Sequence, residues 1–196
     1  MLDSTERISL DFQDAVREYF AFIENQYGFK CSSSDLYCVK YTSDKAYLHV
    51  YHERISFELY FVIGMLPESY NNPLKADTRD FIAMDNSADR VFLYQASKKE
   101  GVRAAVEKLA ELVGTHAQDA LSASLQFYED NANSRTQRQE IAMRIYQLKT
   151  ADQQARIAWD NRDYKAVVEL YTPYEPHLRP AQLKRLNISR KELTSS

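Results

Sequence analysis

The densest group of side chains that could do chemistry lies between residues 47 and 58. It contains two histidines, two carboxylates, an arginine and two tyrosines: Tyr47, His49, Tyr51, His52, Glu53, Arg54 and Glu58. Such side chains serve acid–base catalysis or metal binding when they converge on one point. His49 and His52 are three residues apart, however, and in a β-strand such residues face opposite sides. The two histidines are therefore not expected to share a metal ion, and the sequence assigns no catalytic, cofactor-binding or metal-binding residue.

Strand alternation instead predicts an aromatic surface. Residues 47, 49 and 51 share one face of a strand, and residues 58 and 60 share the matching face of the next strand. Tyrosine is enriched at protein interfaces because it combines a large stiff ring with a hydrogen-bonding tip. We therefore predict an exposed interface made of Tyr47, His49, Tyr51, Arg54, Glu58 and Tyr60. The alternative is that a later helix covers this face and turns it into a second core layer.

The elements around this group indicate an antiparallel sheet covered by a helix. Apolar residues at helical spacing predict a helix over 11–27, with Asp11 or Ser9 capping its start and Gly28 ending it. A period of two then predicts three strands in a meander, at 36–41, 46–52 and 55–64. The odd-numbered residues of the third strand are apolar and are expected to pack against the helix.

The next segment is predicted to be irregular before the chain becomes helical. Two prolines and two asparagines favour a loop over 67–77, and the short apolar runs 81–84 and 91–94 are each a fourth strand or a buried turn, with a strand favoured for 91–94. Ser97 with Glu100, and Ser134 with Gln137, match capping boxes that begin two long helices. The first is expected to break at Gly114-Thr115 and to end at residues 131–133.

The predicted fold class is α+β: an N-terminal helix on a three- or four-stranded antiparallel meander, followed by a C-terminal helical bundle. Residues 1–96 are expected to form the sheet subdomain and 97–196 the helical subdomain, packed together as one unit. After a turn at 160–162, a short helix is predicted at 164–171, and Pro180 opens the last helix.

Composition limits the class of function. The chain has 196 residues, a net charge of -3 and no apolar stretch near the ~20 residues of a membrane span. Its first eight residues lack the apolar core of a secretory signal, so we expect a cytoplasmic protein with no membrane partner. Two cysteines without a nearby Cys/His pair predict free thiols. The basic residues of the tail, Arg179, Lys184, Arg185, Arg190 and Lys191, lack stacking aromatics, which makes nucleic-acid binding an unfavoured alternative.

Two resemblances add to this. Residues 163–171 (DYKAVVELY), with Ala155 before them, resemble the turn and second helix of one tetratricopeptide repeat, although no second copy follows at a 34-residue period. Residues 27–29 (YGF), 39–41 (VKY) and 50–58 (VYHERISFE) resemble small bacterial α+β proteins of toxin–immunity loci. The second resemblance covers about the first 60 residues and implies a non-enzymatic protein that neutralises a partner toxin by binding it.

Three hypotheses of function follow. The leading one is a protein-binding module, an immunity or inhibitor protein that needs no cofactor. The second is a hydrolase or nuclease that uses His49 and Glu58, which lie on one predicted face. The third is a nucleic-acid accessory protein that acts through the basic C-terminal helix. The sequence does not identify the partner or the oligomeric state.

Overall fold

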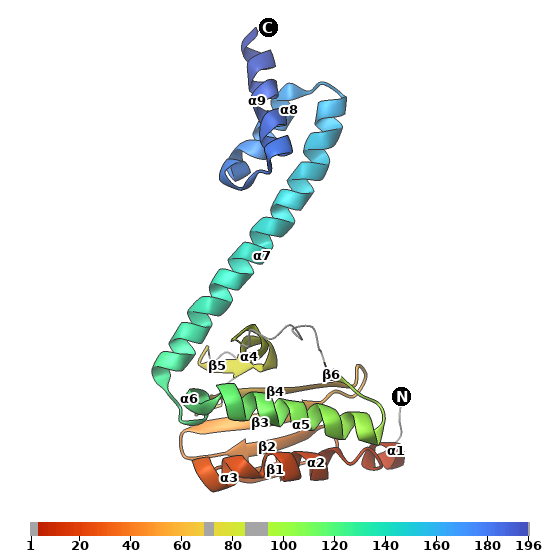
Figure 1. The fold of residues 1–196 in the computed structure, drawn as a ribbon, viewed down its shortest axis with the longest axis vertical. Helices are drawn as coiled ribbons and strands as arrows, with labels where there is room; N and C mark the ends of the chain where they lie inside the picture. Colours follow the sequence, from red (N-terminus) through yellow and green to blue (C-terminus); the bar gives the residue numbers. More distant parts are fainter. Residues whose placement is uncertain (1–3, 69–72, 85–93, 196) are drawn as a thin grey trace. The chain divides into compact units, whose positions relative to one another are not determined.

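The chain forms two compact units, Met1–Arg135 (unit 1) and Thr136–Ser196 (unit 2). The structure, a computed structural model, describes residues 4–68, 73–84 and 94–195 (Figure 1). The α+β fold class is confirmed: N-terminal helices, an antiparallel sheet and a helical second half. Unit 1 extends past the predicted boundary between residues 96 and 97, because the helix after that boundary packs on the sheet.

The predicted N-terminal helix is divided in two. After α1 (Ser4–Ile8), α2 (Phe12–Tyr19) and α3 (Ala21–Tyr27) are separated at Phe20, which is buried in the core. Gly28 ends α3 in a left-handed conformation, as predicted. The predicted caps at Asp11 and Ser9 are wrong. Asp11 makes no capping bond and instead pairs with Arg103, 2.9 Å away, while Ser9 donates to the carbonyl of Glu6.

The predicted meander is present and is extended at both edges. Strands follow the order β1 (Lys30–Ser34), β2 (Cys38–Thr42), β3 (Ala46–His52), β4 (Glu58–Met65) and β5 (Lys75–Asp77), all antiparallel. A short strand, β6 (Tyr94–Gln95), also pairs with β4. β5 lies where a loop was predicted, and residues 91–93 of the favoured strand lie outside the described residues.

Register divides the sheet into an apolar face and an outer face. Val39 of β2 lies opposite Val50 of β3, which lies opposite Phe61 of β4, and all three are fully buried. α2 and α5 (Lys99–His116) pack against each other and against β2 and β4 on this side (Figure 1). The predicted apolar face of the third strand is therefore confirmed within β4.

The helices after the sheet correct several predictions. Residues 81–84 belong to a helix, α4 (Thr78–Met84). Ser97 does not cap α5, whose N-cap is Lys98, and the break falls at Ala117, before α6 (Gln118–Leu121), rather than at 114–115.

The next helix, α7 (Leu125–Asp160), is continuous through residues 131–134. The predictions that one helix ends at 131–133 and that another begins at Ser134 are therefore both wrong. Asn131 does not end it, because this residue is buried and its amide donates to Asp80 Oδ2 at 3.3 Å. Tertiary contact here overrides the local preference of asparagine for helix ends.

Unit 2 is a small helical assembly. The last turns of α7 pack with α8 (Tyr164–Tyr171), the 3₁₀ helix η1 (Thr172–His177) and α9 (Pro180–Ser195), around Ala155, Val167, Tyr171 and Leu186. The predicted short helix at 164–171 is confirmed, and Asp163 caps it by accepting from the amide of Ala166. The Tyr171 hydroxyl donates to the buried Asp152 carboxylate at 2.7 Å, which fixes α8 against α7.

Candidate functional site

The outer face of the sheet carries the predicted aromatic row, but two of its members are buried. Tyr47 is 3% exposed and His49 is 2% exposed, so the prediction that they are open to solvent is wrong. Tyr47 lies across Gly64, its partner on β4, and the rings of Tyr47 and His49 are 4.9 Å apart. The rings of His49 and Tyr51 meet edge to face at 6.1 Å. These ring contacts contribute to the burial of Tyr47 and His49, and α6 also contacts β3.

Gly64 permits this arrangement. A Cβ atom added there would lie 2.6 Å from the Tyr47 hydroxyl oxygen, so Gly64→Ala must displace the ring. We expect this variant to lose about 1–3 kcal/mol of unfolding free energy, measured by urea denaturation. Gly114→Ala, in the helix α5, is the control, because its added methyl group stays 3.8 Å from Phe22 and improves helix propensity. Equal stability of Gly64→Ala and wild type would contradict the packing of Tyr47.

The pair proposed for hydrolysis is not brought together. Val62, not Glu58, lies opposite His49, and Glu58 is four residues further along β4, roughly 13 Å away. The acidic neighbour of His49 is Glu68, whose Oε1 is 3.7 Å from Nδ1. Burial lowers the pKa of His49 although Glu68 opposes the shift. A neutral, enclosed imidazole beside an exposed carboxylate does not match the predicted catalytic pair.

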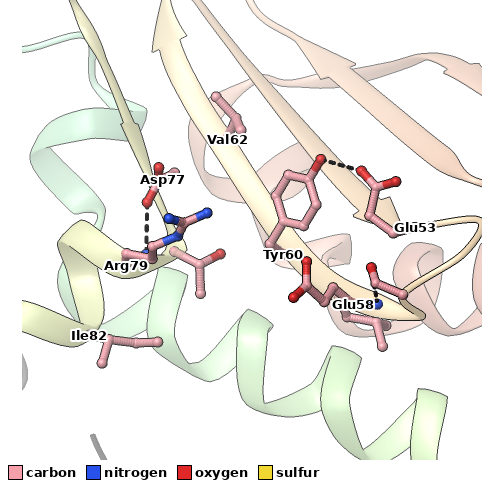
Figure 2. A pocket seen from close by; sticks show the side chains of 10 residues that line it. Glu53, Glu58, Tyr60, Val62, Asp77, Arg79 and Ile82 are labelled. Carbon is pink, nitrogen blue, oxygen red and sulfur yellow. Dashed lines mark hydrogen bonds between the residues drawn. The ribbon is translucent and has the colours of Figure 1, made fainter. Parts of the chain in front are cut away.

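Two half-buried members of the predicted interface, Glu58 and Tyr60, border a hollow of about 290 Å³. Figure 2 shows Glu58, Tyr60 and Val62 on one side of it, and Arg79 and Ile82 of α4 on the other. Glu53, Ser56, Leu59, Asp77 and Thr78 complete the lining. Its volume is at the lower end of ligand pockets, roughly 300–1,000 Å³. We take this hollow as the candidate functional site.

The hollow arises where the edge of the sheet is interrupted. β5 pairs with β4 at residues 62–64, and β6 pairs with β4 at residues 58–59, so neither strand covers residues 60–61. Thr78 fills the gap: its hydroxyl accepts from the amide of Phe61 at 2.8 Å. α4 therefore begins against the edge of the sheet, with the hollow between this helix and β4.

The sequence contains a signal for α4 that the loop prediction missed. Asp77 Oδ1 accepts from the amide of Arg79 at 2.8 Å, and Asp80 Oδ2 accepts from the amide of Asp77 at 3.0 Å. This reciprocal pair is a capping box with aspartate in place of glutamate. It precedes two apolar residues, and it could have predicted a helix with Arg79 in its first turn.

Two of the charged groups in the hollow lack a side-chain partner. Among the residues that the structure describes, no ion pair or hydrogen bond joins the Glu58 carboxylate or the Arg79 guanidinium to another side chain. Glu53, by contrast, accepts from the Tyr60 hydroxyl at 2.7 Å. The pKa of Tyr60 is raised by burial and by this bond to Glu53. The hollow thus offers two carboxylates that already accept hydrogen bonds, Glu53 and Asp77, and two unpaired charges of opposite sign, Glu58 and Arg79.

The buried Arg7 fixes the turn that forms one wall of the hollow. Its guanidinium donates to the carbonyls of Glu53 at 2.6 Å and Arg54 at 2.8 Å, and it lies 4.7 Å from the centre of the Phe57 ring. Phe57 has a φ of 56°, an unusual conformation for a residue with a side chain. These contacts hold the turn so that Ile55, 78% exposed, projects at its tip beside Arg54, which is also exposed.

Three of the five basic residues in the tail already face acidic partners. Arg190 makes two bonds of 2.7 Å to Glu175. Arg179 and Arg185 lie 3.8 and 4.0 Å from Asp152. Because these charges are already matched, the basic helix is a weak candidate for contact with phosphates.

The remaining observations concern metal binding, membrane spans, the cysteines and similarity to known proteins. In the described ranges no three His, Cys, Asp or Glu side chains are placed to hold a metal ion, and no helix there could span a membrane. Cys31 and Cys38 are free thiols. Comparison with protein-family models, curated proteins and solved structures gives no match to this chain.

Proposed function

We propose that this chain is a non-enzymatic protein-binding module, and that the hollow between β4 and α4 is where its partner docks. The observation that carries the proposal is the pair of unpartnered charges, Glu58 and Arg79, beside the half-buried ring of Tyr60. A role as an immunity or inhibitor protein, as the resemblance of the first 60 residues implies, is the use of such binding that we favour.

The lining favours a basic side chain as the group that enters. Three carboxylates, Glu53, Glu58 and Asp77, line the hollow with one guanidinium, Arg79. A lysine or arginine of the partner can place its aliphatic stem along apolar groups and its charge beside Glu58. Val62 and Ile82 supply such apolar groups. Arg79 can then donate hydrogen bonds to a carboxylate or carbonyl oxygen of the partner next to that side chain, which would fix the orientation of the partner.

The rim of the hollow can add contact area. Ile55 projects from the turn, and Tyr51 stacks on Tyr60 with ring centres 4.9 Å apart. Exposed aliphatic and aromatic side chains around a central charged contact exclude water from it, as interface centres require. Tyr47 and His49 are no part of this surface, because both are buried.

Charge reversal at Glu58 tests the proposal. Co-expression with the products of adjacent genes, followed by co-purification and a growth-rescue assay, identifies the partner. With that partner, Glu58→Lys is expected to weaken binding at least tenfold, about 1.4 kcal/mol, measured by calorimetry. The melting temperature is expected to stay unchanged, because the Glu58 carboxylate has no side-chain partner to lose.

Glu107→Lys is the matched control, since it makes the same charge change on an exposed position of α5. It should bind as wild type does. Equal weakening by both variants would show only a long-range charge effect. That result, or the absence of a complex with any adjacent gene product, would contradict docking at the hollow.

A further inference from the structure

A second surface, on unit 2, points to a different partner. The α7 stripe consists of Ile141, Ile145 and Leu148, which follow one another at spacings of four and three and so share one face of the helix. Ile141 is 54% exposed and Ile145 is 63% exposed. Further along the same face, Asp152 and Ala155 are buried by unit 2's own helices. The stripe is therefore the uncovered continuation of a face that is otherwise packed.

Exposure of this kind is unfavourable. Single exposed apolar residues are ordinary on protein surfaces, but residues aligned at helical spacing mark a face that packs against something. Within unit 2, every residue of α7 from 136 to 147 is exposed. A helix of about three turns without tertiary packing is marginal in water. A partner that covers the stripe would remove its apolar side chains from water and would stabilise the helical conformation of this segment.

The side chains beside the stripe are mainly basic, which favours a partner with acidic groups. Residues 136–151 contain three basic side chains, Arg138, Arg144 and Lys149, and one acidic side chain, Glu140. At about 100° per residue, Arg138 and Lys149 lie on one side of the stripe, while Arg144 lies on the other side, one turn after Glu140. Nη1 of Arg144 is 3.0 Å from Nε2 of His177, a contact that leaves its positive charge without a carboxylate.

The same charges argue against a second copy of this chain as the occupant. Two antiparallel α7 stripes packed together would bring the Arg138 and Lys149 flank of one copy against the same flank of the other, which is destabilising. The whole of unit 2 is also basic, with eleven lysines and arginines against seven acidic residues, whereas unit 1 has fourteen against twenty-one. The complementary occupant has an apolar row flanked by carboxylates.

We propose that the α7 stripe docks an amphipathic helix with acidic flanks, supplied by another protein. Recognition of this type places apolar residues at i, i+3 or i+4, and i+7 against the receptor face. Glutamates on either side of that row then meet Arg144 and Lys149. This surface is separate from the hollow of unit 1 and uses none of its residues.

A labelled peptide tests the proposal on the full chain. The probe is a designed helix of about 18 residues, five turns, with a leucine row and flanking glutamates. Fluorescence anisotropy should show binding that weakens when salt rises from ~50 mM to ~500 mM. Ile145→Glu is expected to weaken binding at least tenfold, and a probe with lysines in place of the glutamates should bind at least tenfold more weakly than the acidic one.

The matched control is Ile157→Glu. Ile157 is 64% exposed on the same helix but lies on the side opposite the stripe, so this variant should bind as wild type does. Circular dichroism verifies that both variants keep their helix content. Glu58→Lys should leave peptide binding unchanged, which separates this surface from the proposed function.

Three outcomes would overturn the proposal. Equal affinity of wild type and Ile145→Glu would show that the peptide binds elsewhere. Equal affinity of the acidic and basic peptides would remove the argument from charge. Sedimentation showing a wild-type dimer that Ile145→Glu converts to a monomer would identify a second copy as the occupant.

Discussion

Replacement of Asp80 by asparagine is expected to lower the unfolding free energy by about 3 kcal/mol. Asp80 is buried and accepts from the amide of Asp77, from Asn131 Nδ2 and from the guanidinium of Arg135. Burial opposes ionisation of Asp80, but these donors, with Arg135 first among them, hold its pKa below the usual value. Removal of one partner from a buried ion pair typically costs 3–5 kcal/mol, and the lower figure applies because Arg135 is partly exposed.

Chemical denaturation of Asp80→Asn measures this loss, with Asp130→Asn as the control. Asp130 also lies on α7 but is exposed, and among the residues that the structure describes it accepts only from Gln126, so its replacement should cost less than about 0.5 kcal/mol. Arg135→Ala should destabilise as well, and the double variant should lose less than the sum of the two, because the residues share one network. Additive losses would contradict the coupling of Asp80 to Arg135.

Acidification from pH 6.5 to pH 4 is expected to remove about 3 kcal/mol of stability through His52 alone. This histidine is fully buried, and burial lowers its pKa from 6.5 to about 4. Its Nε2 lies 2.9 Å from the carbonyl of Ala96 and its Nδ1 lies 3.0 Å from Nη1 of Arg7. The neutral tautomer with the proton on Nε2 satisfies both contacts. A second proton would add a positive charge beside Arg7.

The direction of the effect follows from the pKa in each state. The unfolded chain takes up the proton near pH 6.5 and the folded chain only near pH 4, so the contribution is complete above pH 6.5 and is lost as pH falls to about 4. At about 1.4 kcal/mol per pKa unit, the difference corresponds to about 3 kcal/mol. Asp80, whose pKa is lowered instead, loses its contribution only below about pH 3.8, so the two effects are separable.

Urea denaturation of His52→Gln between pH 4 and 7 checks this prediction. The variant should lose most of the pH dependence in this window, with a remainder from His49, whose pKa is also lowered by burial. His116→Gln, a half-exposed position at the end of α5, should keep the wild-type slope. An unchanged slope in His52→Gln would show that another group is responsible. Since Arg7 and His52 hold the turn beside the hollow, binding at the hollow should weaken over the same pH range.

Local patterns predicted the elements whose contacts are close in sequence. The period of two in residues 46–52 gave a strand with the bounds found for β3, and Gly28 ends its helix because only a left-handed residue fits there. Pro180 begins α9, and α8 spans residues 164–171, as their sequence positions indicate. In each case the physical cause lies within a few residues of the chain.

Predictions failed where distant residues supply the decisive contact. Asn131 continues a helix because Asp80, 51 positions away, accepts its amide. Asp11 stands at the N-cap position of α2, but its side chain makes no capping bond and its carboxylate pairs with Arg103 of α5 instead. Likewise, β-strand alternation correctly placed Tyr47 and His49 on the outer face. It did not predict that both side chains are buried, because their burial depends on Gly64 across the sheet and on ring stacking.

The sequence by itself determined the α+β class, the meander and the division of β3 and β4 into an apolar and an outer face, because alternation along a strand is a local property. It also singled out Glu58 and Tyr60, which do line the hollow. Only the tertiary structure decided which outer side chains stay open and that Arg79 of α4 joins them. A hollow forms between segments that fold against each other, and here it exists because β5 and β6 leave residues 60–61 of β4 uncovered.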